Sequence, residues 1–166
     1  ATLEANRRRE VEQQLADSHA ILSSVFEMRG VGIIVTNRKG DVLDCNADFI
    51  DMWNIPKEFL QPEAKKQLIS HIQAQYQLTE QGKEEMIDLY RHLNKDQTHI
   101  LHLNDGRLFE RSTRGLYVKG EAKGRIWYYE DITHRVRSRE ALQRSERRTR
   151  AIVNAVPDLM LLLQPS

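Results

Sequence analysis

The order of strand-like and helical segments is the feature that most limits what this chain can fold into. Two short apolar segments, 31–37 and 42–45, come first, and amphipathic helical segments follow them. Three further strand-like segments then lie within 98–132. This order predicts an α+β domain, in which a five-stranded antiparallel sheet carries helices on one face.

Turn residues separate the strand-like segments. Gly40, in "RKGD", supplies a permissive backbone between the first two. "NDG" (104–106) lies between two alternating segments and is a strong hairpin signal. "KGEAKG" (119–124) predicts a looser turn before a last strand over 125–132.

The middle of the chain has helical spacing. Asn46 is a good N-cap for a helix over 46–53, in which Phe49 and Trp53 share one face. Apolar residues repeat at helical spacing again over 62–79 and 83–93.

A long helix is expected on each side of the domain, over 3–28 and from Thr133 to about Val156. In both, partly apolar positions recur at alternating spacings of three and four, which is typical of a narrow coiled-coil seam. The seam of the second helix is weakly apolar, so we expect a marginal coiled coil and a homodimer through the flanking helices. The seam residues are Val11, Leu15, Leu22, Val25, Leu142, Ile152 and Val156.

An internal similarity predicts a tandem array. "ILSSV" (21–25) resembles "IVNAV" (152–156) about one domain length later, although two short amphipathic helices can also be alike by chance. In a tandem array, "PDLMLLL" starts the first strand of a second copy. The expected organisation is an N-terminal linker helix (1–29), a domain (30–133), a signalling helix (134–156) and the start of a second, truncated domain (157–166).

Three stretches carry recognisable motifs: "GIIVTNRKGDVLDCNADF" (32–49), "NDGRLFERSTRGL" (104–116) and "GRIWYYEDIT" (124–133). In this order and spacing they resemble a PAS domain of bacterial sensory proteins, over roughly residues 20–134. The resemblance implies the PAS fold and the sensing of a small molecule, light, redox state or oxygen. It also implies signal transfer through the flanking helices to downstream PAS and output domains, commonly a two-component histidine kinase or a cyclic-di-GMP enzyme such as a diguanylate cyclase.

The PAS resemblance also implies which side chains face the ligand cleft. An inward Arg111 could hold a carboxylate or phosphate in a bidentate pair. The alternative, which we favour from the sequence, is an internal ion pair with Asp131 or Glu130, because buried charges need partners. The candidate ligand-binding residues are Phe49, Leu101, Phe109, Arg111, Trp127 and Tyr129.

No cofactor is identified from the sequence; haem and non-covalent flavin stay open, but nothing in the sequence supports either. His71 and His92 lie on expected helices, but a lone histidine is a weak sign of haem. Cys45 lies on the second strand, whereas the flavin-reactive cysteine of the family lies in the helical region. His99 and His102 are three apart on a strand and therefore point to opposite faces, so they cannot bind one metal together. We expect no catalytic or metal site, and no enzyme activity in this segment.

"YYEDITHRVRSREAL" (128–142) passes from strand to helix with little turn chemistry between them. We expect Asp131, Ile132 and Thr133 to form a rigid joint that transmits the signal, with the Thr133 hydroxyl capping the helix. The alternative is that these residues only end the strand.

Charge and composition exclude several other classes. The net charge is +1, and the arginines of the second helix flank a heptad seam, so we expect no nucleic-acid partner. No apolar segment approaches the ~20 residues that span a bilayer. One cysteine agrees with a cytoplasmic segment, and the sequence leaves open a membrane anchor upstream. Two functions stay open: a ligand-responsive sensory module, or a ligand-free dimerisation and relay module whose cleft is filled by its own large side chains.

Overall fold

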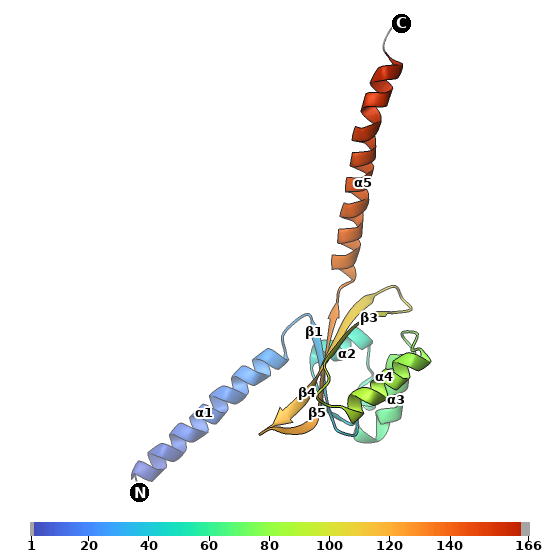
Figure 1. The fold of residues 1–166 in the computed structure, drawn as a ribbon. Coiled ribbons are helices and arrows are strands. Elements are labelled where there is room, and N and C mark those ends of the chain that lie inside the picture. Colours follow the sequence, from blue (N-terminus) through green and yellow to red (C-terminus); the bar gives the residue numbers. More distant parts are fainter. Residues whose placement is uncertain (1, 164–166) are drawn as a thin grey trace. The chain divides into compact units, whose positions relative to one another are not determined.

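The computed structural model of the chain describes residues 2–163. The chain divides into two units, one up to Asp131 and the other from Ile132. The first unit holds helix α1 (Thr2–Phe26) and a sheet with its own helices, and the second holds helix α5 (Thr133–Leu162) (Figure 1).

The sheet has five strands in the order β2-β1-β5-β4-β3, and every neighbouring pair is antiparallel. The predicted sheet is therefore confirmed. The last strand in the sequence lies at the centre of the sheet, between the first and the fourth. The strands are β1 (Val31–Asn37), β2 (Val42–Cys45), β3 (Gln97–His102), β4 (Leu108–Val118) and β5 (Glu121–Asp131).

The connection between β4 and β5 is tighter than the sequence predicts. Val118 pairs with Glu121, so only Lys119 and Gly120 form the turn. Both turn residues have positive φ, 51° and 79°, which suits the right-handed twist of a hairpin. Strand β5 therefore begins at Glu121 and not at residue 125.

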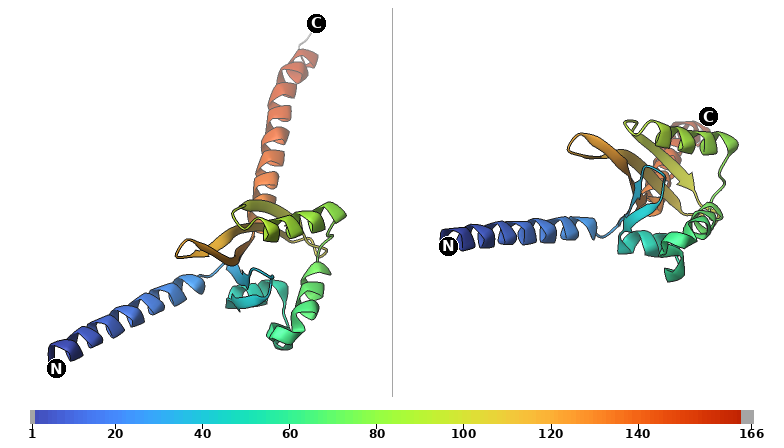
Figure 2. Two further views of the ribbon diagram at one scale, coloured as in Figure 1. Left: turned by 60° about the horizontal axis from the view of Figure 1, so that its bottom comes forward. Right: turned by 90° about the horizontal axis from the view of Figure 1, so that it is seen from below.

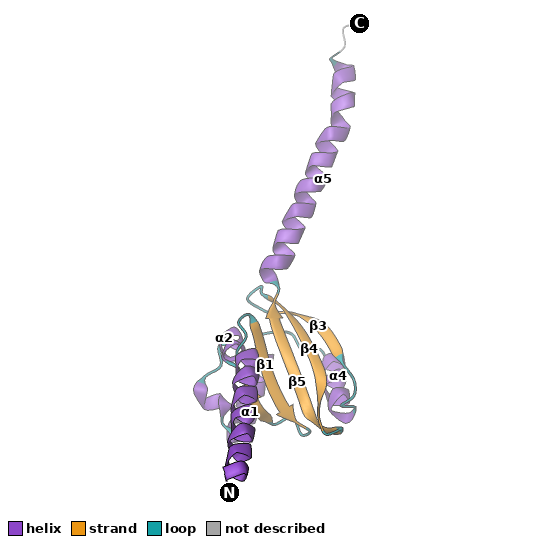
Figure 3. Ribbon diagram, turned by 90° about the vertical axis from the view of Figure 1, so that its left-hand side faces the viewer, coloured by secondary structure: helices purple, strands orange, loops and turns teal. Residues whose placement is uncertain are grey.

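Three helices lie on one side of the sheet: α2 (Ala47–Trp53), α3 (Lys65–Gln73) and α4 (Glu80–Arg91) (Figures 1 and 3). Two 3-10 turns, Lys57–Leu60 and Pro62–Ala64, join α2 to α3 within the same run of chain between β2 and β3 (Figure 2). This arrangement confirms the predicted helical face.

The helix predicted over 62–79 ends at Gln73. Beyond it, Tyr76 forms an isolated antiparallel bridge with Leu103, and the Asn104 amide donates to the Gln75 carbonyl at 2.8 Å. The backbone here bonds to the end of the β3–β4 hairpin, so it cannot continue the helical ladder. A new helix starts at α4, where the Thr79 hydroxyl accepts from the Gly82 amide.

Asn46 joins three elements and is completely buried. Its side-chain oxygen accepts from the amides of Phe49, at 3.0 Å, and Ile33, at 2.8 Å. Its side-chain nitrogen donates to the carbonyls of Phe26 and Val31. The predicted N-cap of α2 is therefore confirmed, and the same side chain also holds the start of β1.

The core lies between the inner face of the sheet and the three helices. Phe49, Trp53 and Phe109 have no exposed surface. The Trp53 ring packs edge-on against Phe109 and Tyr129, with centroids 5.1 and 5.4 Å apart. Gly32 lets α2 approach the sheet, because a Cβ there would lie 3.0 Å from the Phe49 Cα. The inward orientation implied by the PAS resemblance is confirmed by the burial of Leu101, Phe109, Arg111, Trp127 and Tyr129.

Helix α5 is longer than predicted and passes through Pro157 to Leu162. The strand expected from residue 157 is therefore wrong for residues 157–162, and residues 164–166 lie outside the described part of the chain. A strand needs a neighbour to bond its amides and carbonyls, whereas a helix bonds its own, so α5 continues despite the proline. The second domain copy stays a prediction.

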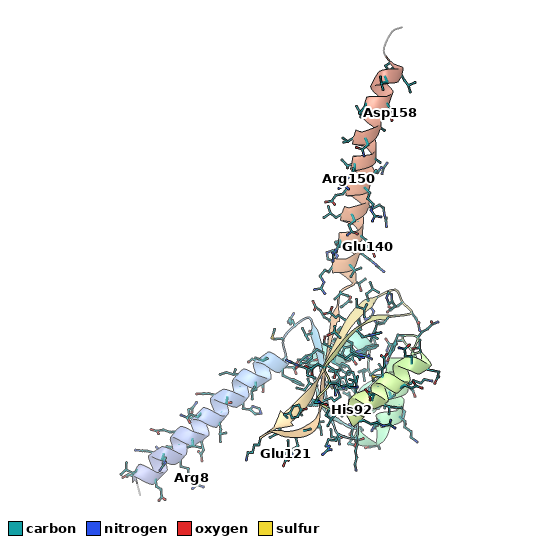
Figure 4. The ribbon with its side chains drawn as sticks, viewed as in Figure 1. Arg8, His92, Glu121, Glu140, Arg150 and Asp158 are labelled. Carbon is teal, nitrogen blue, oxygen red and sulfur yellow. The ribbon has the colours of Figure 1, made fainter. Side chains whose placement is uncertain are left out.

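The two long helices carry the predicted seam residues on exposed surface. Charged side chains project from the same helices, for example Arg8 on α1 and Glu140 and Arg150 on α5 (Figure 4). The seven seam residues, Val11, Leu15, Leu22, Val25, Leu142, Ile152 and Val156, are all exposed, and their pairing in a dimer stays a prediction. No helix within residues 2–163 is long and apolar enough to cross a membrane.

Candidate functional site: a cavity between the sheet and the helices

A cavity of about 260 Å³ lies between the inner face of the sheet and helices α2, α3 and α4. This volume is just below the range of about 300–1,000 Å³ that is usual for ligand pockets, so it suits a small molecule. The lining residues are Ile34, Thr36, Lys39, Gly40, Val42, Phe49, Lys65, Leu68, Ile69, Ile72, Gln73, Tyr76, Met86, Tyr90, Arg111, Trp127 and Tyr129.

The structure brings four of the six predicted ligand-binding residues to this cavity: Phe49, Arg111, Trp127 and Tyr129. Leu101 and Phe109 belong to the packed core and are not lining residues. Phe109 is covered by Trp53 and by the Arg107 guanidinium, 4.9 Å from the ring centroid.

Tyr90 on α4 is part of the cavity wall that the sequence analysis did not identify. Its hydroxyl shares a hydrogen bond of 2.8 Å with Thr36 on β1 and accepts from the Trp127 indole on β5 at 3.1 Å. These bonds connect α4 to two strands. The helical repeat of Met86 and Tyr90 was the available signal, because it places both on the buried face of the helix.

Arg111 is 6% exposed and its guanidinium lies 5.4 Å from the Trp127 ring centroid. Its nitrogens donate to the Met86 sulfur and the Gln97 side-chain oxygen, both at 3.5 Å. The strand register excludes Glu130 as its partner: Arg111 pairs with Tyr129, so Glu130 points to the opposite face. Asp131, the other expected partner, is exposed at the end of β5.

The tyrosine hydroxyls beside Arg111 stay protonated at neutral pH. Burial raises the pKa of Tyr129, and the positive charge of Arg111 opposes this only in part. Burial also raises the pKa of Tyr76, where Arg111 again acts in the opposite direction. Around Arg111, the cavity wall therefore combines a buried cation with neutral hydroxyl groups.

The turn between β1 and β2 is held against α3 by Lys65. The Lys65 ammonium donates to the Asp41 carboxylate at 2.7 Å and to the Lys39 carbonyl at 2.9 Å. The hydrogen bond from Lys65 is the main reason that the pKa of Asp41 is lowered. Gly40, at the tip of this turn, has φ of 81° and faces the Tyr90 ring.

Arg125 is a second buried arginine, with no exposed surface, and the sequence analysis missed it. Its Nε donates to the Thr113 hydroxyl at 3.0 Å. Its Nη atoms donate to carbonyls in and after the last turn of α4, with Leu89 at 2.8 Å, Leu93 at 3.4 Å and Lys95. The phase that turns Trp127 inward also turns Arg125 inward, but the expected strand began at residue 125.

The histidines considered for haem bond to other groups. The His71 ring bonds to the Trp53 carbonyl at 2.9 Å and packs on Phe59. His92, at the end of α4, bonds to Asp88 at 2.8 Å. Neither is a lining residue of the cavity. Burial raises the pKa of the Cys45 thiol to about 11, which disfavours its reactive thiolate form.

Strand β5 passes into α5 through one residue, as the sequence predicts. The strand ends at Asp131 and the helix begins at Thr133. The Ile132 carbonyl accepts from the Val136 amide at 2.9 Å, so the helical ladder starts at once. The roles of Asp131, Ile132 and Thr133 in signal transfer stay predictions.

Comparisons with known proteins agree with this architecture. A protein-family model described as PAS fold matches residues 26–140, and the chain belongs to this family. PAS domains are generally non-catalytic sensory modules. No curated protein matches the chain.

Solved PAS domains share the fold. The PAS domain of Bordetella pertussis BvgS has 17% identity and a TM-score of 0.52, over 78% of this chain and 98% of that one. The PAS domain of an HTR-like protein from Haloarcula marismortui has 13% identity and a TM-score of 0.51, over 75% and 99%. A PAS domain from Colwellia psychrerythraea has 19% identity and a TM-score of 0.50, over 69% and 97%. Likeness at these identities shows the fold alone.

Proposed function

We propose that this PAS domain is a sensory module that binds a small ligand in the cavity between its sheet and helices. The signal passes through Asp131, Ile132 and Thr133 to α5. It then reaches a downstream PAS domain and an output domain of a bacterial signalling protein, a histidine kinase or a cyclic-di-GMP enzyme. The cavity of about 260 Å³ is the observation that carries this proposal.

The position of the cavity supports a role in signalling. A ligand there touches α3 and α4 on one side and β5 on the other, where Trp127 and Tyr129 line the wall. Strand β5 is central in the sheet and ends at Asp131, the first residue of the proposed joint. A ligand shifts a conformational equilibrium only if it binds one state better than the other. A ligand that contacts both the helices and the sheet meets this condition when the helices move relative to the sheet.

Ligand binding can be tested on the purified chain by native mass spectrometry, an absorbance scan and thermal shifts with a metabolite panel. We expect a retained small molecule, or a compound that stabilises the fold by about 2.7 kcal/mol at 100 times its Kd. Ile72→Trp, which fills the cavity from α3, is the control and should lose the response. Absence of a retained molecule, with the same panel response in both proteins, would contradict the proposal.

A second candidate function is ligand-free dimerisation and relay. It is favoured by the exposed apolar residues at seam positions, such as Leu142 and Ile152 on α5. In this alternative, large side chains such as Phe109, Trp127 and Tyr129 fill the cleft. Phe109 does pack into the core, but Trp127 and Tyr129 border the remaining cavity, so ligand binding is the better supported function.

The dimer can be tested by sedimentation velocity. Leu142→Asp with Ile152→Asp places charges on the seam and should convert a dimer to a monomer. Gln143→Asp with Ala151→Asp is the matched control, because these neighbouring exposed residues lie on the helix face away from the seam, and it should remain dimeric. A seam variant that sediments like the unchanged protein would rule out this interface.

A further inference from the structure

Arg111 is a buried cation without an anionic partner among the described residues. It is 6% exposed, and its hydrogen bonds to the Met86 sulfur and the Gln97 amide oxygen are both at the long distance of 3.5 Å. Its other side-chain partner is the neutral hydroxyl of Tyr76, whose pKa this hydrogen bond lowers against the effect of burial. The ion pairs within the described part of the chain are formed by other residues. A guanidinium does not lose its proton in proteins, so this positive charge persists in the core and favours a negative partner.

The cavity places this charge where a ligand can reach it. Arg111 is itself a lining residue, and Tyr129, its partner across the strand pair, lines the same wall. Among the described lining residues, those with a full charge at neutral pH are all cationic: Lys39, Lys65 and Arg111. Lys65 already pairs with Asp41, which leaves Arg111 as the deeper, less compensated charge.

The rest of the wall is suited to an apolar body. Phe49 contributes an aromatic surface from α2, and Leu68 and Ile72 contribute aliphatic surface from α3. The hydroxyls of Tyr76 and Tyr129 are close enough to Arg111 for its charge to act on both pKa values, and both groups are neutral donors at pH 7. The wall is thus mostly apolar, and Arg111 with the two tyrosine hydroxyls forms a polar, cationic region within it.

We infer that the cavity binds a small organic carboxylate, whose carboxylate pairs with Arg111 and whose apolar body packs against Phe49, Leu68 and Ile72. This inference rests on the ligand-binding function proposed above and names the class of its ligand. A guanidinium matches a carboxylate in bidentate geometry. A single buried arginine compensates a monoanion better than a phosphate, which carries a charge of about −1.5 to −2.

Matched probe pairs test the charge of the ligand. Phenylacetate and phenylacetamide have almost the same shape, as do hexanoate and hexanamide, and phenyl phosphate tests the alternative anion. Titration calorimetry and thermal shifts with the whole chain should show each carboxylate binding about 10- to 100-fold tighter than its amide, the range of a charge-assisted hydrogen bond.

Arg111→Gln should remove this preference, and Arg111→Lys should keep part of it, because lysine retains the charge but not the planar fork. Arg114→Gln is the matched control: the same change, on the same strand, at an exposed residue that does not line the cavity. It should bind every probe as the unchanged protein does. A thermal melt of each variant without probe shows that it is folded.

The outcomes separate this inference from the proposed function. Amides that bind as tightly as carboxylates would overturn the carboxylate inference and leave ligand binding intact. Phenyl phosphate binding tightest would also overturn it, in favour of a phosphorylated ligand. Binding of none of the probes would overturn it as well, and native mass spectrometry would then decide separately whether the domain binds any ligand.

Discussion

Arg111 and Arg125 are both buried on the inner face of the sheet, yet their surroundings differ. Each guanidinium lies near the Trp127 ring, at 5.4 Å for Arg111 and 5.9 Å for Arg125. Arg125 donates to a hydroxyl and to a group of backbone carbonyls, whereas Arg111 has a sulfur and an amide oxygen at 3.5 Å. The positive charge of Arg125 is compensated by hydrogen-bond acceptors of the fold itself, whereas that of Arg111 is compensated poorly.

The positions of the two arginines along α4 explain this difference. Arg125 meets the chain at and beyond the last turn of the helix, at Leu89, Leu93 and Lys95. Carbonyls at the end of a helix lack intrahelical partners and carry partial negative charge. Arg111 meets the same helix at Met86, within it, where the carbonyls are already bonded. The first arginine is therefore expected to stabilise the fold, and the second is the one that we propose pairs with a ligand.

The substitution Arg125→Met should have the largest effect. It leaves buried carbonyls, including that of Leu89, without a donor and removes several charge-assisted hydrogen bonds. We expect a loss of about 3 kcal/mol or more in the free energy of unfolding. Urea denaturation followed by circular dichroism measures this loss. An unchanged midpoint would show that Arg125 is not a structural anchor.

Thr113→Val should have an intermediate effect. The Thr113 hydroxyl accepts from Arg125 Nε and donates to the Ile126 carbonyl, both at 3.0 Å. Its removal leaves both groups short of a partner, at a cost of about 1–2 kcal/mol in urea denaturation. Thr98→Val, at an exposed threonine of β3, is the control and should change stability by less than about 0.5 kcal/mol. Equal effects at the two positions would contradict the role of Thr113.

Arg111→Met should change stability little, within about 1 kcal/mol, and the change should favour the folded state. The same substitution at Arg125 is the direct comparison, because both replace a buried guanidinium with an apolar side chain. Urea denaturation of the two variants side by side measures the difference. If both variants lose similar stability, Arg111 also supports the fold and the distinction between the two arginines fails.

The smallest effect is expected at alkaline pH, through Tyr129. Burial raises the pKa of Tyr129 above its ordinary value of about 10, so the unfolded chain releases this proton first. The contribution of protonated Tyr129 to the free energy of unfolding is therefore fully present below pH ~10 and is lost as the pH rises further. Tyr129→Phe should make this loss shallower, measured as the free energy of unfolding across that range.

Cys45 also loses a proton in this pH range, so its contribution has to be separated from that of Tyr129. The raised pKa of its thiol, about 11, adds a loss of the same sign, so the measurement is cleanest in a Cys45→Ala background. Because Arg111 lowers the pKa of Tyr129, Arg111→Met should move tyrosinate absorbance to higher pH, and Arg111→Lys should not. Equal pH profiles with and without Tyr129 would contradict this prediction.

Signals between residues close in the sequence were enough to predict most of the strands and helices. Period-two alternation grouped the side chains of β4 and β5 into two faces, and the resemblance to PAS domains indicated which face is inward. The "NDG" turn, together with Asn46 as an N-cap, identified element boundaries. These signals depend on backbone preferences and on contacts near in sequence. Alternation therefore placed Arg111, Trp127 and Tyr129 on one face, and the PAS resemblance turned that face toward the helices.

Only the tertiary structure decided how each inward side chain is used. The bond from Arg125 to the Leu89 carbonyl joins residues far apart in the chain, as does the bridge between Tyr76 and Leu103 that ends a helix early. Alternation says that Arg111 and Arg125 both point inward, but not which one meets free carbonyls. That depends on where α4 ends against the sheet, which is set by long-range packing and not by local propensity.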